Sequence, residues 1–364
     1  MFCGGQPKKK SREHIIPRWL MRLTGDPNRK CFFGPFLNEK GDLVRRAFPL
    51  DNFAFPACDE CNQKLSELEG SAREVVSSIL DEKPLSSADF GVLLTWLDKI
   101  RVGLWLGGYQ MTKNVWYIAP QFFINSRIDR SDRMVLIYRS SHTRSRLVFQ
   151  SPSFPAFQYQ PTCFFLIVNN FLFLNVSTDF FLSRRLGLPY PSHICYTNSP
   201  EVEMQMDEGT GRILTPVVKF KFDRRCAQIL QPMFPRDDIR SMVPSSYDTD
   251  YVKSMSIDHA RGIGKVLYVD GLTVSSFPAQ KTDCWVPPMI YDDHEAVEIV
   301  IEQAIKFQDY LLEYGPTESK IGFGNIDKEK QALIKEQLKV AKTVNRNLLA
   351  RLKNPKGQGR QTTY

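Results

Sequence analysis

A close cysteine pair, Cys58 and Cys61, lies in a part of the sequence that offers little else to hold a fold together. Residues 1–70 are rich in Cys, Gly, Pro and charged residues and contain few long periodic apolar runs. Such a segment cannot bury a large core, whereas a Cys-x-x-Cys pair supplies half of a four-ligand zinc site. The sequence therefore predicts a small N-terminal module that is held together by a metal ion.

A second group of residues in this module points to hydrolysis assisted by a divalent cation. Glu13 and His14 are adjacent, and Asn62 directly follows the second cysteine of the pair. The carboxylate of Glu13 and the amide oxygen of Asn62 are hard ligands that suit Mg²⁺ or Mn²⁺. The pKa of histidine lies near neutrality, so His14 can take a proton from water. Each feature has an ordinary explanation when taken singly, and only their combination favours a catalytic site.

The order and spacing of three segments resemble the HNH, or ββα-metal, endonuclease family. Lys10-Ser-Arg-Glu-His-Ile-Ile-Pro-Arg-Trp-Leu20 is similar to the first strand and turn of that family. Asp51-Asn52 resembles its central Asn step, and residues 58–67 resemble the start of its metal-site helix. The resemblance covers about the first seventy residues, a fifth of the chain, and Asn62 makes the motif an H-N-N variant.

The resemblance implies a metal-dependent endonuclease that hydrolyses phosphodiester bonds and leaves 5′-phosphate and 3′-hydroxyl ends, with DNA as the expected substrate. His14 would be the general base that activates water. Glu13 and Asn62 would hold one Mg²⁺ or Mn²⁺, which stabilises the leaving 3′-oxygen. Asn52 would orient its loop and thereby the ring of His14.

The resemblance also implies that Cys58 and Cys61 bind a structural zinc ion. Family members with this layout carry another Cys-x-x-Cys just before the acid–His step. Cys3 matches the second cysteine of that pair, and the first would fall immediately before Met1. The true start lies upstream, or Cys31 supplies the fourth ligand, or the zinc site is degenerate. The expected ligands are Cys3, Cys58 and Cys61, with Cys31 as a further candidate.

Positive charge is concentrated at the two ends of the sequence. Residues 1–50 contain eleven Lys/Arg and four Asp/Glu, and residues 327–364 contain ten and three, whereas the whole chain has a net charge of +8. Basic clusters neutralise phosphates and supply much of the non-specific affinity for nucleic acid. A solvated face and a solubilising tail explain the same charges. The candidate nucleic-acid contacts beside the site are Lys8, Lys9, Lys10, Arg12 and Arg18.

The rest of the chain predicts a mixture of helices and strands. Residues 67–106 have the apolar spacing of two helices, and residues 115–280 are mostly strand-like. Within this block, residues 134–138 and 146–149 are expected to pair with each other. Residues 163–168 and 171–176 are expected to form a hairpin, because Asn169-Asn170 suits a tight turn.

Two C-terminal helices are predicted, over residues 294–314 and 327–353, and Gly315-Pro316 should end the first. Six residues form one stripe on the second helix: Ile334, Leu338, Ala341, Asn345, Leu348 and Leu352. A polar Asn in such a stripe suits the seam of a homodimer. Stripes of this kind more often pack on their own domain, which is the preferred interpretation.

The predicted fold class is α+β: an N-terminal ββα-metal HNH module, a larger mixed α+β domain and a C-terminal helical pair. The expected boundaries are 1–74 for the nuclease module, 75–290 for the α+β domain of unknown role, and 291–364 for the C-terminal helices and basic tail. The longest apolar run, residues 163–176, is too short to span a bilayer. Without a signal peptide or a disulfide framework, the chain is expected to be cytoplasmic.

Two other functions remain open on the sequence alone. The first is a zinc-stabilised nucleic-acid-binding protein that does not cleave. The second is a nuclease effector of an antiviral defence system, which a protein partner would gate through the larger domain.

Overall fold

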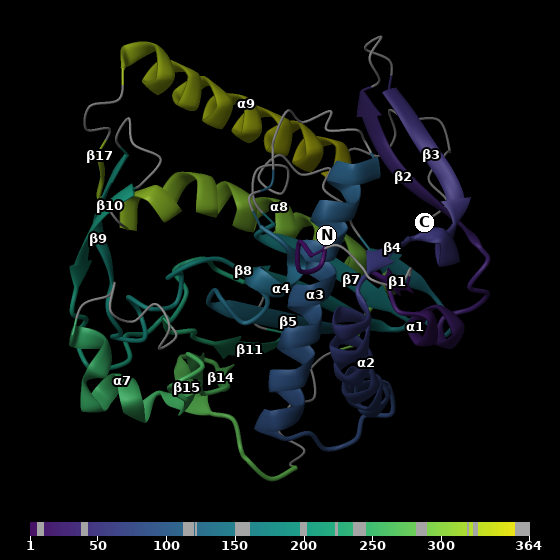
Figure 1. Ribbon diagram of the computed structural model, residues 1–364, viewed down its shortest axis with the longest axis horizontal. Coiled ribbons are helices and arrows are strands. Elements are labelled where there is room, and N and C mark those ends of the chain that lie inside the picture. Colours follow the sequence, from purple (N-terminus) through teal and green to yellow (C-terminus); the bar gives the residue numbers. More distant parts are fainter. Residues whose placement is uncertain are drawn as a thin grey trace.

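One large β-sheet forms the centre of the fold in the computed structural model (Figure 1). The part of the chain that the structure describes is mixed α+β, as predicted, and contains seven α-helices. The described residues are 1–5, 11–37, 43–111, 120, 122–149, 161–196, 202–222, 225–235, 245–281, 290–318, 320–322 and 327–353.

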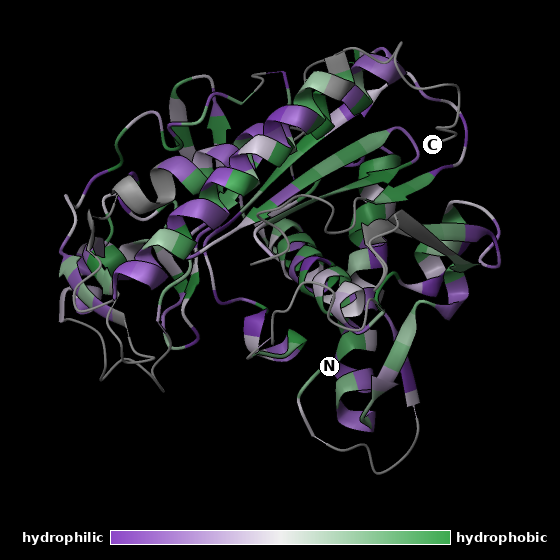
Figure 2. Ribbon diagram, turned by 90° about the horizontal axis from the view of Figure 1, so that it is seen from above, coloured by the Kyte–Doolittle hydropathy of each residue, from purple (hydrophilic) through white to green (hydrophobic). Residues whose placement is uncertain are grey.

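The large sheet has eight strands in the order β15-β14-β11-β5-β8-β7-β6, and β16 pairs with β5 alone. Its strands are β5 (Arg133–Ser140), β6 (Leu147–Phe149), β7 (Cys163–Val168), β8 (Phe171–Ser177), β11 (Ala227–Gln231), β14 (Leu267–Asp270), β15 (Thr273–Ser276) and β16 (Ile290–Tyr291). Every residue of β7 and β8 is buried, so both faces of these strands are covered. Continuous apolar sequence is typical of such strands, and Figure 2 shows the hydrophobic character of the sheet.

The predicted hairpin over residues 163–176 is confirmed, but the predicted pairing of residues 134–138 with 146–149 is wrong. β7 and β8 are antiparallel neighbours, and Asn169 in their turn has a left-handed φ of 54°. β5 pairs with β8 and β11, whereas β6 pairs with β7 at the edge of the sheet. The hairpin lies between β5 and β6, so each of its two strands has a hydrogen-bonded neighbour on both sides.

Two long helices pack on the central strands. α3 (Ser87–Met111) contacts β5 and β8, and α8 (Asp293–Glu318) contacts β5, β7 and β8. α3 is apolar around most of its circumference, which is typical of a helix covered on all sides. Its glycines permit a close approach of the N-terminal residues. A Cβ at Gly103 would lie 2.7 Å from Cδ1 of Ile15, and one at Gly107 would lie 2.9 Å from the Phe53 ring.

Two antiparallel strands and a helix form the N-terminal unit. β1 (Ser11–His14) pairs with β4 (Ala54–Ala57), and α2 (Asp59–Leu80) follows β4 directly. Between the two strands lie α1 (Arg18–Leu23), the antiparallel pair β2 (Lys30–Leu37) and β3 (Leu43–Pro49), and the short 3₁₀ helix η1 (Leu50–Asn52).

α2 begins eight residues earlier than the apolar spacing predicted. Cys58 caps the helix, because its Sγ accepts a hydrogen bond from the backbone N–H of Cys61 at 3.4 Å. The negative charges of Asp59 and Glu60 in the first turn stabilise the helix, because they lie at the positive end of its dipole. The predicted domain boundary after residue 74 falls inside this helix, and α2 in turn packs on α3.

The two C-terminal helices, α8 and α9 (Lys328–Lys353), pack on each other. Ala341 and Asn345 of the predicted stripe are buried, and Asn345 Nδ2 donates to Asp309 Oδ1 at 2.8 Å. The preferred interpretation, packing within the chain, is therefore confirmed. The predicted end at Gly315-Pro316 is wrong, since α8 continues to Glu318. Proline breaks a helix mainly in its interior, and only two helical residues follow Pro316.

Smaller elements complete the described part of the chain. A three-stranded sheet has the order β10-β9-β17, and a separate pair joins β12 to β13. Their bounds are β9 (Tyr190–Tyr196), β10 (Val202–Asp207), β12 (Ser256–Asp258), β13 (Ile263–Gly264), β17 (Lys320–Gly322), α4 (Ile124–Arg127), the 3₁₀ helix η2 (Ser245–Asp248) and α7 (Asp250–Ser254). Among the described helices, none is both long enough and apolar enough to cross a membrane.

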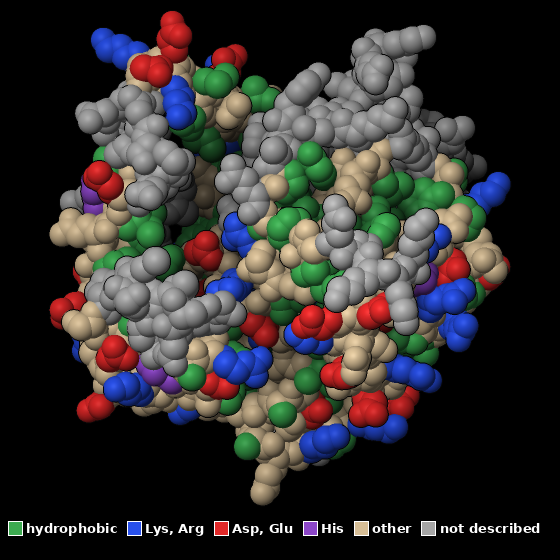
Figure 3. Space-filling view, in the orientation of Figure 1, with side chains coloured by type: hydrophobic (Ala, Val, Ile, Leu, Met, Phe, Trp, Pro, Cys, Tyr) green, Lys and Arg blue, Asp and Glu red, His purple; other side chains and the backbone are tan. Residues whose placement is uncertain are grey.

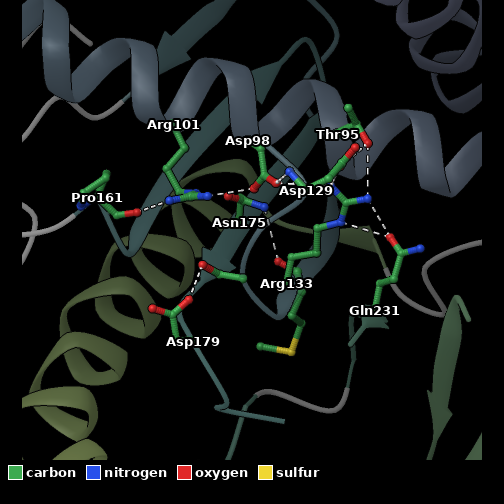
Figure 4. A network of polar contacts seen from close by, with 11 residues as sticks. Thr95, Asp98, Arg101, Asp129, Arg133, Pro161, Asn175, Asp179 and Gln231 are labelled. Atoms are coloured by element: carbon green, nitrogen blue, oxygen red, sulfur yellow. Dashed lines mark hydrogen bonds and ion pairs between the residues drawn. The ribbon is translucent and has the colours of Figure 1, made fainter. Parts of the chain in front are cut away.

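A network of buried charges joins α3 to the sheet (Figure 4). The Asp98 carboxylate is completely buried and accepts hydrogen bonds from Arg101 at 2.7 Å and from Arg133 at 3.1 Å. Arg133 is also buried and donates two hydrogen bonds to Gln231 on β11 and one to Thr95 on α3. Removing one member of such a network leaves the opposite charge buried without its partner.

We expect Asp98→Ala to destabilise the fold by about 3–5 kcal/mol, because it leaves two buried guanidinium groups without this carboxylate. Equilibrium urea denaturation measures the change. Asp81→Ala removes an exposed ion pair with Lys83 and should change stability by less than about 1 kcal/mol. Equal stability of the two variants would contradict the structural role of the network.

Candidate active site and metal centre

β1 places the two adjacent candidate catalytic residues on opposite faces, because side chains alternate along a strand. Its pairing with β4 sets Glu13 opposite Phe55 and His14 opposite Ala54. The Glu13 side chain is buried, whereas that of His14 is 19% exposed. Glu13 therefore has protein partners, and His14 retains access to solvent.

The ring of His14 is oriented by the loop that precedes β4. His14 Nε2 lies 3.0 Å from the backbone carbonyl oxygen of Asp51 in η1. A carbonyl only accepts hydrogen bonds, so Nε2 carries the proton and Nδ1 of the neutral ring keeps a lone pair. Burial lowers the pKa of His14 below 6.5. The ring is therefore neutral near pH 7 and can accept a proton at Nδ1.

Arg18 holds the residue that orients His14. Its Nε and Nη2 donate to the two carboxylate oxygens of Asp51 at 2.7 and 2.9 Å, a bidentate geometry with high specificity. Arg12 donates to the backbone oxygen of Ala54 at 3.1 Å. Both arginines, predicted as nucleic-acid contacts, thus bind within the N-terminal unit.

The other predicted nucleic-acid contacts, Lys8, Lys9 and Lys10, lie outside the described residues. On the face shown in Figure 3, the described basic and acidic side chains are interspersed. Contact with a polyanion through the basic ends therefore stays a prediction.

Glu13 takes part in a buried ion cluster that the sequence analysis missed. The Lys99 side chain is fully buried, and its Nζ lies 2.6 Å from Glu13 Oε1 and 2.7 Å from the backbone oxygen of His14. Lys99 Nζ also donates to Glu69 Oε1. Burial raises the pKa of Glu69 to about 7. The only local signal was the charged run at residues 98–101 inside an otherwise apolar helix.

The two asparagines predicted as site residues are Asn52, at the end of η1, and Asn62, at the start of α2. Asn62 is in the first turn of α2, and its backbone N–H donates to the carbonyl of Cys58 at 2.9 Å. Its side chain is half-buried. Asn52 is exposed at the end of η1, next to the Asp51 carbonyl that contacts His14, and it borders a shallow pocket with Phe53. The sequence position of Asn52 thus coincides with the loop that orients the histidine.

Three predicted zinc ligands converge at the start of α2. The Sγ atoms of Cys3, Cys58 and Cys61 all lie within 4.8 Å of one another, and those of Cys3 and Cys58 are 3.7 Å apart. The backbone N–H of Cys61 lowers the pKa of the half-buried Cys58 thiol. A thiolate is the form that binds metal, so the three thiols can hold a metal ion such as zinc.

The N-terminal residues reach this cluster by binding to α4. The carbonyl oxygens of Met1 and Phe2 accept hydrogen bonds from the N–H groups of Ile124 and Asn125, at 3.1 and 2.9 Å. The side chain of Asn125 also donates to Cys61 Sγ at 3.2 Å. Asn125 is thus a further residue beside the thiol cluster, and no spacing in the sequence connects it to the cysteines.

Cys31 lies apart from this cluster. Its thiol donates to the carbonyl of Phe48 at 3.4 Å, and burial raises its pKa to about 11. Among the described residues, its Sγ is not part of the group of thiols that lie within 4.8 Å of one another. The geometry therefore favours Cys3, Cys58 and Cys61 over Cys31 as ligands.

No protein-family model, no curated protein and no solved structure matches this chain. The residues of the site form a three-thiol cluster, a histidine with a free ring nitrogen, and a buried carboxylate bound by lysine.

We expect the purified protein to bind one zinc ion per chain and Cys58→Ser to lose it, because the substitution removes a thiolate ligand. Inductively coupled plasma mass spectrometry measures the metal content. Cys31→Ser is the matched control and should retain the zinc. Loss of zinc from the Cys31 variant, with retention in the Cys58 variant, would contradict this assignment of ligands.

Proposed function

We propose that this chain is a metal-dependent endonuclease of the HNH type, which hydrolyses phosphodiester bonds of nucleic acid, with DNA as the expected substrate. One observation carries the proposal. The pairing of β1 with β4, directly followed by α2, brings the segments of Glu13-His14 and Cys58–Asn62 into one strand–strand–helix unit. This is the order of elements that the ββα-metal resemblance implies.

In the proposed mechanism, His14 is the general base. Its Nε2–H donates to the Asp51 carbonyl, which fixes the ring and leaves Nδ1 to take a proton from the attacking water. Arg18 holds Asp51 in place and so acts through it on the histidine. Burial keeps the ring neutral, the form that a base requires.

Glu13 and Asn62 would hold the catalytic cation. Their side chains offer a carboxylate and an amide oxygen, which fit Mg²⁺ or Mn²⁺. Glu13 uses Oε1 for Lys99, and its second carboxylate oxygen is the one that would bind the metal. When bound, the cation would stabilise negative charge on the phosphate and the leaving oxygen. The three-thiol cluster would have a separate, structural role at the start of α2.

We expect cleavage of plasmid DNA in Mg²⁺ or Mn²⁺, and a loss of about 10²–10⁴-fold in rate for His14→Ala, which removes the general base. Agarose gel electrophoresis of the plasmid forms gives the rates. His294→Ala is the matched control, because His294 is exposed at the start of α8. A zinc-loaded protein that binds DNA without cleaving it would instead support a non-catalytic nucleic-acid-binding protein.

The rate of cleavage at saturating metal should rise with pH and reach its plateau near neutrality. His14 must be deprotonated to act as a base, and burial lowers its pKa below 6.5, so the midpoint should lie below 6.5. A series of single-turnover rates between about pH 5 and pH 8 covers this range. A midpoint above pH 7 would contradict the assignment of His14 as the base.

A further inference from the structure

We infer that Lys99 and Glu69 are positioning residues for Glu13 and His14 in this site. The inference rests on the proposed function, in which Glu13 binds the catalytic cation and His14 is the base. Lys99 comes from α3 and Glu69 from the middle of α2. Both lie beyond the segments that carry the motif.

The ammonium of Lys99 has three N–H donors and three acceptors around it. They are Glu13 Oε1 at 2.6 Å, the His14 carbonyl oxygen at 2.7 Å, and Glu69 Oε1. The lysine side chain is completely buried, so water does not compete for these donors. One group therefore restrains both the carboxylate of the proposed metal ligand and the backbone of the proposed base.

Glu69 connects the same ammonium to the helix that carries Asn62. Residues 62 and 69 are seven apart, which places them on the same side of α2, about two turns from each other. Lys99 thus joins β1, which holds Glu13, to the helix that holds the second proposed metal ligand. Groups that bind a metal ligand in this way fix its orientation, and their loss weakens metal affinity by about 10–100-fold.

The positioning role can be tested by removing the ammonium together with the second carboxyl group that binds it. The double variant Lys99→Met/Glu69→Gln removes these two groups and keeps the carboxyl group of Glu13. The variant therefore lacks the ammonium that binds the Glu13 carboxylate and the His14 backbone. A lower affinity for Mn²⁺ would then report that Glu13 is no longer held in position.

The test is the affinity of the zinc-loaded protein for Mn²⁺, measured by electron paramagnetic resonance of free Mn²⁺. We expect the double variant to bind Mn²⁺ at least about 10-fold more weakly than the wild type. Glu302→Gln/Lys306→Met is the matched control, since it makes the same two changes at a partly exposed ion pair on α8. The control should keep the wild-type affinity.

Each outcome decides a different claim. A folded double variant with wild-type Mn²⁺ affinity overturns the positioning role and leaves the nuclease proposal standing. If Glu13→Gln has no effect on Mn²⁺ binding or on cleavage, the proposed site itself is overturned, and this inference with it. If circular dichroism shows that the double variant is unfolded, Glu69→Ala alone is decisive, because it removes the oxygen that accepts from Lys99. It should weaken Mn²⁺ binding by at least about 3-fold, and an unchanged affinity overturns the inference.

Discussion

Two adjacent buried charges on α3, Asp98 and Lys99, determine how the described parts of this structure are joined. A charge in the interior is stable only when partners surround it, so each of these side chains fixes the elements that pair with it. Asp98 binds Arg133 of β5 and Arg101 of its own helix, and Lys99 binds Glu13 and Glu69 of the N-terminal unit. Neighbouring residues on a helix point about 100° apart. One turn of α3 therefore binds both the large sheet and the N-terminal unit.

The same helix explains why the small N-terminal unit is not an isolated metal-held module. Gly103 and Gly107 let α3 approach residues 15 and 53 closely, and apolar residues of both regions belong to one continuous core. The thiol cluster adds a second attachment, since residues 1 and 2 bind α4 while Cys3 lies beside Cys58. Glu13 is thereby held by the buried ion cluster, and Asn62 directly follows Cys61 of the cysteine cluster.

The local sequence pattern correctly predicted those helices and strands that pack on a neighbour close in the sequence. It also predicted contacts between residues of one spaced motif. The β7–β8 hairpin follows from two apolar runs around Asn169-Asn170, and the α8–α9 packing follows from the stripe through Ala341 and Asn345. The motif also predicted the convergence of Cys3 with the close cysteine pair. The partner of β5 could not be chosen in the same way, because several apolar strands fit beside it equally well and only the complete sheet decides their order.

By itself, the sequence determined the identity of the groups that can do chemistry: a histidine beside an acid, an asparagine after a cysteine pair, and a basic N-terminal segment. The tertiary structure alone decided which groups hold them. Lys99 is 86 residues from Glu13 and 30 from Glu69, and Asn125 is 64 residues from Cys61. No helical or strand period extends over such separations. The contacts of Lys99 exist because buried charges require partners, and the fold brings these partners together from distant parts of the chain.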